Sequence, residues 1–227
     1  MQKLLSLFVL ISTMSATGCG EEKVAPVKHE PTVNNADRTT QNTKKGTILF
    51  FGNSLTAGYG IEPTDAFPAL IQQKIDSMAL PYTIINGGVS GETSAGGNQR
   101  IDFVLKQQPI NVFVLELGAN DGLRGMPLAE TRKNLQAIID KVKEKYPSAK
   151  LVLAGMQMPP NLGQAYTSEF RNLFPELAKA NNMTLIPFLL EGVAGQTRLN
   201  LEDGIHPTAE GHRIVAETVW KAINSLL

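Results

Sequence analysis

Ser54 follows the apolar run of residues 48–51, Ile-Leu-Phe-Phe, after only Gly52 and Asn53. A buried strand that ends there presents a hydroxyl group at the edge of a sheet, where it can attack an electrophile, cap a helix or turn the chain. No Lys follows as in a P-loop, the glycines lack the dinucleotide-binding spacing, and Thr56 replaces the second glycine of the G-x-S-x-G elbow. By itself, Ser54 is more typical of a cap or a turn than of a nucleophile.

A candidate base and its partner lie near the other end of the chain, in DGIHPTAEGH, residues 203–212. Asp203 and His206 are three residues apart, and Gly204 permits a tight turn between them. This spacing lets Asp203 hold one ring nitrogen of His206 while the other nitrogen faces outward, as a general base requires. A surface Asp–His pair explains the same residues equally well. His212 has no such partner, so we assign it to solvent or to packing.

Two further segments are rich in groups that can donate hydrogen bonds to an anion. NGGVSGETSAGG, residues 86–97, has glycines that allow positive φ and let backbone N–H groups approach a ligand. LGANDG, residues 117–122, offers the side-chain N–H groups of Asn120, while Asp121 can cap the next turn. Each segment is also compatible with an ordinary turn when it is considered alone.

Short apolar runs alternate with helical patterns from Thr47 onward. Strands are predicted at residues 47–52, 82–86, 110–118, 150–158 and 183–188. Helices are predicted at residues 65–78, 95–108, 127–146, 167–181 and 208–226, the last with Thr208 as its N-cap. This alternation predicts an α/β fold, a three-layer α/β/α sandwich with a five-stranded parallel sheet. Ligands of such sheets bind at the carboxyl ends of the strands, so the segments described above should meet there.

Four stretches of the chain, taken together and in order, resemble the sequence blocks of the SGNH hydrolases, also called the GDSL family. They are GNSLTAGYG, GVSGETSAGG, ELGANDGLRG and DGIHPTAEGH, and the similarity extends over residues 47–224. They look most like the bacterial branch of thioesterase I, lysophospholipase L1 and arylesterase. The resemblance implies a flavodoxin-like SGNH hydrolase fold and a carboxylic ester hydrolase.

The same resemblance implies a role for each matched residue. Ser54 is then the nucleophile, His206 its base, and Asp203 the group that orients His206. The backbone N–H groups of Ser54 and Gly91, together with the side chain of Asn120, form the oxyanion hole. The implied chemistry is acyl transfer to Ser54 followed by hydrolysis of the acyl-enzyme.

Two positions depart from this family pattern. Asn53 stands where the family name calls for Asp, and Glu92 stands where this branch often has Asp. Because His206 is the implied base, loss of a carboxylate at position 53 should not abolish catalysis. The role of Asn53 is left open.

The segment MQMPPNLGQAYTSEF, residues 156–170, is predicted to lie beside the site. Met158, Pro160 and Asn161 are the candidate substrate-binding residues, since Met adapts to irregular apolar ligands; a core methionine with a stiff loop is equally compatible. The resemblance implies acyl esters, thioesters, lysophospholipids or aryl esters as substrates. The alternatives are a carbohydrate O-acetylesterase and, in a different class, a non-catalytic lipoprotein that binds lipid or glycan.

The bulk composition narrows the classes of partner. The chain has 227 residues, with 21 Lys and Arg against 21 Asp and Glu, and a formal net charge of zero. A balanced charge argues against a general nucleic-acid binder. The three histidines are scattered and there is one cysteine, so we expect no metal and no cofactor. The oligomeric state is left open.

The first 18 residues have the pattern of a secretory signal peptide: Lys3, an apolar stretch at residues 4–14, then small residues. ATGC, residues 16–19, resembles a bacterial lipoprotein box, which makes Cys19 the predicted lipidation site; an incidental cysteine after an ordinary signal is the alternative. Residues 19–46 are polar and predict a flexible tether, and residues 47–227 form the hydrolase domain.

These features predict an exported protein of the cell envelope that associates with a membrane through lipidated Cys19. Gly20 follows the cysteine and lacks the charge of an Asp retention signal. An outer membrane is therefore the expected destination in a cell that has one.

Overall fold

The structure is a computed structural model that describes residues 46–227. The predicted signal peptide, Cys19 and the tether up to residue 45 lie outside the described residues. Five parallel strands form one sheet in the order β2-β1-β3-β4-β5, which confirms the predicted sheet. Their bounds are Gly46–Gly52 for β1, Tyr82–Gly88 for β2, Val112–Glu116 for β3, Lys150–Ala154 for β4 and Thr184–Ile186 for β5.

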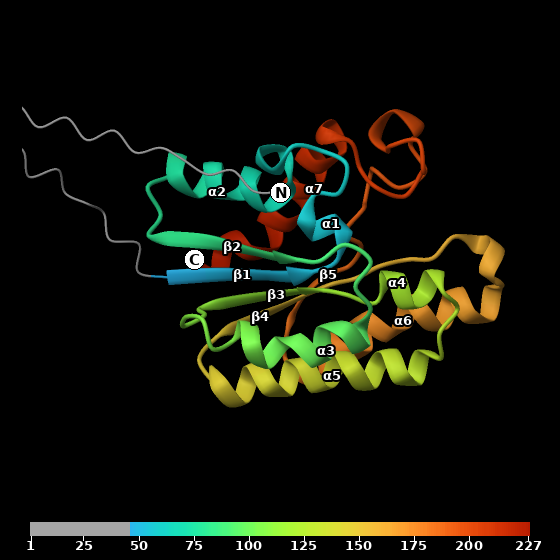
Figure 1. Cartoon of the computed structure of the whole chain (residues 1–227), viewed down its shortest axis with the longest axis horizontal. Helices are drawn as coiled ribbons and strands as arrows, with labels where there is room; N and C mark the ends of the chain where they lie inside the picture. The colour runs from blue at the N-terminus through green and yellow to red at the C-terminus, as the bar shows by residue number, and fades with distance from the viewer. Residues whose placement is uncertain (1–45) are drawn as a thin grey trace, which may run out of the picture. The chain divides into compact units, whose positions relative to one another are not determined.

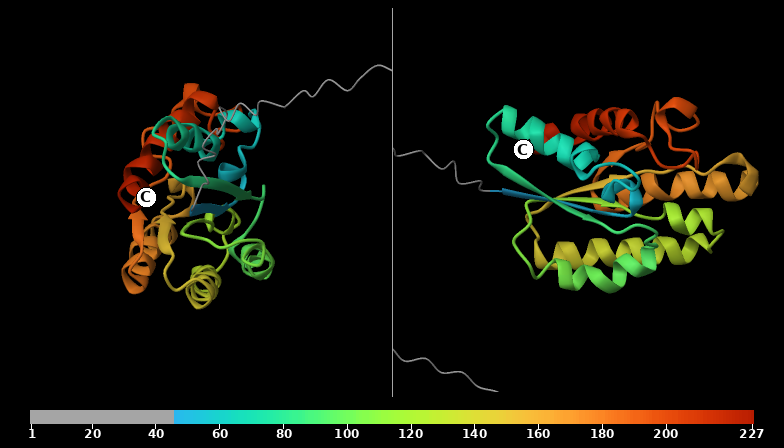
Figure 2. Two further views of the ribbon diagram at one scale, coloured as in Figure 1. Left: turned by 90° about the vertical axis from the view of Figure 1, so that its left-hand side faces the viewer. Right: turned by 45° about the horizontal axis from the view of Figure 1, so that its top comes forward.

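Helices cover both faces of the sheet and complete the predicted three-layer sandwich (Figures 1 and 2). Helices α2 (Phe67–Ser77) and α7 (Ala209–Ile223) pack on one face. Helices α3 (Ser94–Val104), α5 (Leu128–Lys145) and α6 (Gln164–Asn181) pack on the other. Single 3₁₀ turns occupy Pro63–Asp65, Pro160–Leu162, Thr197–Leu199 and Asn224–Leu226.

Two short helices that the sequence pattern did not reveal follow the central strands. They are α1 (Ser54–Ala57) and α4 (Ala119–Leu123). Helices of four or five residues complete little more than one turn, so they show no apolar periodicity. Both lie at the carboxyl ends of strands, where the predicted site residues are.

The central strands form the middle of the hydrophobic core. The side chains of residues 48–51 in β1 are at most 1% exposed, and those of residues 112–115 in β3 are at most 2% exposed. Strands covered on both faces are continuously apolar rather than alternating. Edge strand β2 is only half-buried. Phe50 of β1 meets Phe67 of α2 edge to face, with ring centroids 5.4 Å apart, and so joins the sheet to one helical layer.

Predicted strand four extends further than β4 does. The ladder between β4 and β5 pairs Val152 with Thr184 and ends at Ala154 and Ile186. Because β5 has only three residues, residues 155–158 have no strand beside them with which to extend the ladder. The apolar residues Met156 and Met158 therefore belong to a loop rather than to a strand.

The last helix is capped and anchored as a structural unit. Thr208 Oγ1 accepts a hydrogen bond from the N–H of Gly211 at 3.3 Å, which confirms the predicted N-cap. His212 is buried, and its Nδ1 accepts the N–H of Phe67 at 3.1 Å, which joins α7 to the start of α2. Burial lowers the pKa of His212 to about 4, so the neutral ring persists at pH 7. His212 is a packing residue, one of its two predicted assignments.

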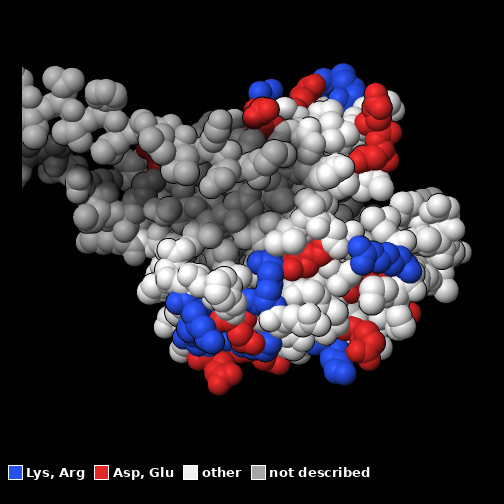
Figure 3. Space-filling model, in the orientation of Figure 1, with Lys and Arg blue, Asp and Glu red and all other residues white. Residues whose placement is uncertain are grey.

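Charged side chains of both signs lie interspersed on the face drawn in Figure 3. In residues 46–227, ion pairs join neighbouring helices, among them Lys141–Asp102 at 2.9 Å and Arg132–Glu176 at 2.7 Å. Exposed pairs of this kind contribute little to stability, typically about 0–1 kcal/mol. Within residues 46–227, none of the helices combines the length and the apolar character needed to cross a bilayer.

The strand ends that carry the predicted site lie level with one another. Gly52 at the end of β1 pairs with Gly88 of β2 on one side and with Glu116 of β3 on the other. The chain leaves β1 and β3 toward opposite faces of the sheet, so the strand order reverses between their ends, which is where doubly wound sheets bind ligands. The register therefore brings the loops that follow these three strands together.

Candidate active site

Ser54 is the first residue of α1 and lies two residues beyond the end of β1. Asn53 is the N-cap, and its Oδ1 accepts the N–H of Leu55 at 3.0 Å. Gly58, with φ at 78°, ends the helix in the left-handed conformation after a single turn. This strand–turn–helix arrangement fixes the backbone around Ser54, whose side chain remains at the edge of the sheet.

The structure joins Ser54 to the predicted base from 152 residues away. His206 Nε2 lies 2.8 Å from Ser54 Oγ, and His206 Nδ1 lies 2.6 Å from Asp203 Oδ2. The tautomer with its proton on Nδ1 leaves Nε2 free to accept the serine proton. The three predicted residues thus form one continuous chain of hydrogen bonds.

Asp203 also organises the turn that carries His206. Its Oδ1 accepts the backbone N–H groups of Ile205 at 2.9 Å and His206 at 3.0 Å. The hydrogen bond from the His206 backbone N–H is the largest cause that lowers the pKa of Asp203 to about 2; burial opposes it, and the His206 side chain and the Ile205 N–H lower the pKa further. Asp203 is therefore ionised at neutral pH. Gly204 between them has φ at 69°, a conformation that glycine adopts without strain.

Tyr59 is an additional site residue that the sequence interpretation missed. Its ring lies against the imidazole of His206, with ring centroids 4.6 Å apart, while 52% of the residue stays exposed. Gly58 and Gly60 on either side of Tyr59 both have positive φ. No local signal separates this tyrosine from an ordinary loop aromatic, because its partner is far away in sequence.

The predicted oxyanion donors come from the ends of β1, β2 and β3. The first N–H groups of a helix have no partner within it, and Asn53 takes that of Leu55, which leaves the N–H of Ser54 for a ligand. Gly91 has φ at 78°, and its carbonyl oxygen accepts Nη2 of Arg124 at 3.1 Å. No atom lies within 4 Å of the place that a Cβ would take at Gly91, so its glycine serves conformation rather than space.

Asn120 is held by the loop that carries Gly91. Its Nδ2 donates to the carbonyl oxygen of Glu92 at 3.0 Å. The side-chain amide nitrogen has two hydrogens, so one remains for an oxyanion while the other orients the group. Glu92 in turn pairs with Arg100 through two contacts of 2.6 Å. The departure from Asp at position 92 therefore keeps a carboxylate, and that carboxylate anchors the loop to α3.

Asp121 has a different role from the predicted one. It does not cap the next turn, since neither α4 nor α5 has a side-chain cap. Its buried carboxylate instead accepts the backbone N–H of Ser94 at 2.9 Å and the Ser94 hydroxyl at 2.5 Å. Thr131 adds a longer contact of 3.4 Å. A carboxylate at a helix N-terminus satisfies free N–H groups and complements the helix dipole. Asp121 therefore holds α3, and the loop before it, against α4.

The predicted substrate-binding residues lie in the loop after β4. Met158 is half-buried and packs against Gly122 of α4, since a Cβ at Gly122 would lie 2.5 Å from its sulfur. Asn161 is exposed. The side chain of Pro160 lies outside what the structure describes. Tyr166, in the first turn of α6, donates its hydroxyl to the carbonyl of Met126 at 2.8 Å and so ties the start of α6 to the connection between α4 and α5. Contact of these residues with substrate stays a prediction.

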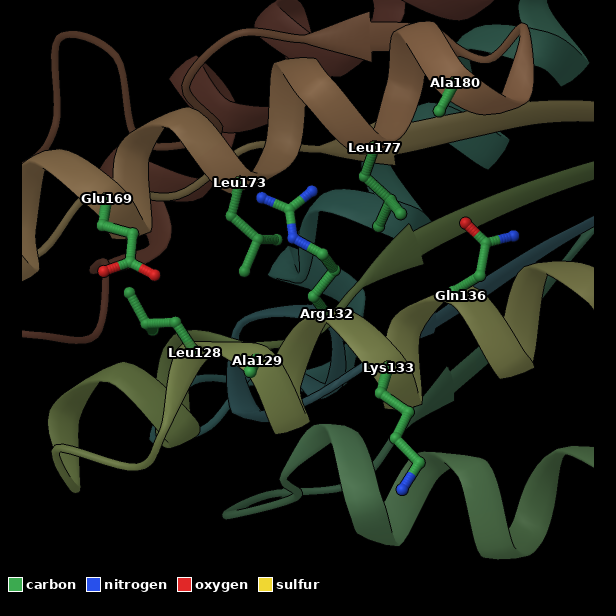
Figure 4. A pocket seen from close by; sticks show the side chains of 9 residues that line it. All are labelled: Leu128, Ala129, Arg132, Lys133, Gln136, Glu169, Leu173, Leu177 and Ala180. Atoms are coloured by element: carbon green, nitrogen blue, oxygen red, sulfur yellow. The ribbon is translucent and has the colours of Figure 1, made fainter.

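A separate hollow of about 530 Å³ lies between α5 and α6, away from these residues (Figure 4). Its floor is apolar, with Leu128, Leu173 and Leu177, and its rim carries charged groups such as Arg132 and Glu169. None of the predicted site residues lines it. The site lies instead on the open surface at the carboxyl ends of the strands.

The fold and the site define a class of protein. A three-layer α/β sandwich with a Ser–His–Asp hydrogen-bond chain at the carboxyl edge of its sheet is the arrangement of a serine hydrolase. The chain belongs to the GDSL-like lipase/acylhydrolase family, whose model matches residues 50–214. This is the family that the four sequence blocks indicated.

Known proteins agree with this assignment. The chain is 36% identical to "Esterase TesA" of Pseudomonas aeruginosa over 188 residues, which cover 83% of this chain and 92% of that protein. It is 34% identical to "Thioesterase 1/protease 1/lysophospholipase L1" of Escherichia coli K12 over 181 residues, or 80% and 85% of the two chains. A crystal structure of TesA, 36% identical, matches with a TM-score of 0.76 and covers 80% of this chain and 99% of that one. The protein is therefore a serine ester hydrolase.

Proposed function

We propose that the protein cleaves carboxylic esters in two steps through an acyl-Ser54 intermediate. In the first, Ser54 Oγ attacks the ester carbonyl carbon while His206 Nε2 takes the hydroxyl proton. The bond between the carbonyl carbon and the leaving oxygen then breaks, and His206 returns the proton to the leaving alcohol. In the second, water attacks the acyl carbon, His206 takes one water proton and returns it to Ser54, and the carboxylic acid leaves.

The observation that carries this proposal is the hydrogen-bond chain from Asp203 through His206 to Ser54, at 2.6 and 2.8 Å. A hydroxyl that is hydrogen-bonded to an imidazole, itself oriented by a carboxylate, has the arrangement needed to activate a nucleophile. The N–H groups of Ser54 and Gly91 and the amide of Asn120 are the proposed donors to the tetrahedral intermediate. Removing one such donor typically lowers kcat by about 10²–10³.

Exposed apolar side chains on the segments that carry the site residues favour an apolar ester. Tyr59, Val89, Leu123 and Ile205 are 39–52% exposed, and each lies on a segment that also carries a site residue. They account for four of the six large hydrophobic residues recorded as exposed in residues 46–227. Single exposed apolar residues need no explanation, but their gathering around one site does.

We therefore propose esters and thioesters of apolar acyl groups, including lysophospholipids, as the substrate class. The relative named thioesterase 1/protease 1/lysophospholipase L1 supports this choice. A carbohydrate O-acetylesterase is the second candidate from the sequence. No contact in the described residues favours it over the first.

A substrate panel on the purified domain tests the proposal. Acetyl, butyryl, octanoyl and palmitoyl esters of one chromogenic alcohol are compared with a lysophospholipid and an acetylated sugar, and Ser54→Ala is the matched inactive variant. We expect labelling of the wild type by a fluorophosphonate, none of Ser54→Ala, and the highest kcat/KM on a longer acyl chain. Activity confined to acetylated sugars would overturn the substrate class. Turnover by folded Ser54→Ala would overturn the mechanism. An unlabelled and inactive wild type would overturn the enzyme assignment and favour a non-catalytic binding protein.

We also propose that the protein is exported and anchored at the cell envelope through a lipid on Cys19. The support comes from the composition of residues 1–20, which lie outside the described residues. Each buried CH₂ of an acyl chain contributes about 0.8 kcal/mol to membrane binding, so two or more chains suffice for stable anchoring. Cys19→Ser in the native host, followed by fractionation and mass spectrometry of the mature N-terminus, tests it. An unmodified N-terminus in the wild type would exclude the anchor without affecting the esterase proposal.

A further inference from the structure

One buried carboxyl group lies beside the nucleophile and takes no part in the steps proposed above. Glu116 is the last residue of β3, pairs with Gly52 in the sheet, and is 1% exposed. Its Oε1 accepts Nδ2 of Asn53 at 2.7 Å. Its Oε2 accepts the backbone N–H of Asn53 at 3.1 Å and the hydroxyl of Thr56 at 2.8 Å. Both oxygens are thus bound to the turn that presents Ser54.

These contacts leave the amide of Asn53 only one orientation. Its Oδ1 accepts the N–H of Leu55 at 3.0 Å and lies 3.4 Å from Ser54 Oγ, while its Nδ2 faces Glu116. A backbone N–H can only donate, so the N–H of Leu55 by itself requires Oδ1 on its side of the amide; Glu116, when ionised, can only accept and requires Nδ2 on the other side. A reversed amide would place donor against donor at Leu55 and acceptor against acceptor at Glu116, which buried polar groups do not tolerate without cost.

The neighbouring glycine leaves room for this arrangement. A Cβ at Gly52 would collide with Thr56 Oγ1 and with Glu116 Oε2. Gly52 therefore leaves room for the carboxyl group of Glu116, from the neighbouring strand β3, to reach the turn that presents Ser54. The groups that face the Glu116 carboxyl are the side chain and backbone of Asn53 and of Thr56, none of which titrates.

We propose that Glu116 is a positioning residue for Ser54: by fixing the Asn53 amide and Thr56, it holds the first turn of α1 so that the serine hydroxyl meets His206. The inference rests on the proposed function, because it assumes that Ser54 is the nucleophile. It also gives a physical reason for Asn53. An aspartate there would face Glu116 across the same 2.7 Å, and the two carboxyl groups would have to share one proton. The amide supplies that hydrogen permanently.

A set of three variants tests the pair. Glu116→Gln places an amide NH₂ against the Asn53 NH₂, which can only donate. Asn53→Asp creates two facing carboxyl groups, and the double variant restores one donor facing one acceptor with the roles exchanged. Glu62→Gln, the same change at an exposed position, is the control. The readouts are kcat, KM, the rate of fluorophosphonate labelling and the pH profile of each, with urea unfolding to establish that each variant is folded.

We expect Glu116→Gln to lower kcat and the labelling rate by about tenfold or more with KM within about threefold, because the interaction positions the nucleophile and not the substrate. Asn53→Asp should stay within about tenfold of wild type at mildly acidic pH and lose activity as the shared proton leaves at higher pH. The double variant should recover most of the wild-type kcat and lose this alkaline decline. Glu62→Gln should behave as wild type.

Two results would overturn the inference while leaving the proposed function intact. One is an active wild type with folded Glu116→Gln at the same kcat and pH profile. The other is a double variant no better than the single variants, which also decides the matter if Glu116→Gln does not fold. An inactive and unlabelled wild type would instead overturn the proposed function, and the positioning role with it.

Discussion

Asp203→Asn separates the two tasks of the triad acid. Asp203 Oδ1 accepts two backbone N–H groups, at 2.9 and 3.0 Å, and Oδ2 accepts the imidazole at 2.6 Å. An asparagine oxygen can keep the first task, so the turn around Gly204 should persist. The asparagine NH₂ group cannot accept the Nδ1–H of His206. The variant should therefore be folded, with the hydrogen-bond chain to Ser54 broken at one link.

The expected loss of kcat in Asp203→Asn depends on how exposed the His206–Asp203 pair is to solvent. Two unit charges about 4 Å apart interact by about 1 kcal/mol in bulk water and about 4 kcal/mol near a protein surface. The side chains of His206 and Asp203 are 19% and 38% exposed, which places them between these limits. An amide N–H facing Nδ1 also selects the tautomer with its proton on Nε2, which cannot take the serine proton. We expect kcat to fall by about 10²–10³, equivalent to about 3–4 kcal/mol.

The assay is steady-state hydrolysis of a chromogenic ester by wild type, Asp203→Asn and Asp203→Ala, with the rate of fluorophosphonate labelling as a direct measure of Ser54 reactivity. Asp203→Ala loses both tasks and should unfold at lower urea than Asp203→Asn. KM should stay within about threefold for Asp203→Asn, since the carboxylate of Asp203 is bonded to Ile205 and His206 and acts on the reaction through His206. A folded Asp203→Asn enzyme with kcat within about threefold of wild type would refute the role of this carboxylate.

Three further predictions concern residues around the triad. Asn120→Ala should lower kcat by about 10²–10³ with a smaller effect on KM in the ester assay, because its hydrogen bond strengthens as the oxyanion forms; a pure KM effect would reassign Asn120 to substrate binding. Gly122→Ala should destabilise the fold by about 1–3 kcal/mol in urea unfolding, because its Cβ would lie 2.5 Å from Met158 Sδ and 2.7 Å from the buried Phe170 ring; an unchanged midpoint would contradict that packing. Burial raises the pKa of Glu116 from 4.5 to about 7 against the opposing effect of its hydrogen bonds. Between pH 4.5 and pH 7 the folded state therefore holds a proton on Glu116 that the unfolded state has released. Wild-type stability should therefore fall by up to about 3 kcal/mol from pH 4.5 to pH 7, and Glu116→Gln should remove that slope; equal slopes would contradict the assignment.

The fold was predictable because its main signals are long and local. Five apolar runs and five helical patterns, in strict alternation, permit few topologies other than a parallel sheet covered on both faces. The exceptions are short: α1 and α4 have four and five residues, too few to show a period. The apolar content of residues 150–158 also predicted a strand longer than β4 is. A strand ends where its neighbour ends, and the sequence does not show that β5 has only three residues.

The buried polar contacts around the site were not predictable in the same way. Glu116 stands near the end of an apolar run, and Asp121 stands in an Asn-Asp-Gly turn. Acidic residues in such places usually face solvent. Their partners are Asn53, 63 residues away, and Ser94, 27 residues away. A buried carboxylate is stable only with donors around it, and no local pattern shows which distant donors will arrive. The role of Asn53, left open by its sequence, depends on such a partner.

The base reaches Ser54 by a route that strand register does not determine. Ser54, Gly91 and Asn120 follow adjacent strands whose ends lie level, so the sheet itself brings them together. His206 instead follows β5, at the far edge of the sheet, and the segment between β5 and α7 must bring it back to the end of β1. The buried hydrogen bond from Phe67 N–H to His212 fastens α7 to the helix that follows the nucleophile turn. Because α7 begins three residues after His206, fixing this helix also fixes one end of the turn from which His206 reaches Ser54.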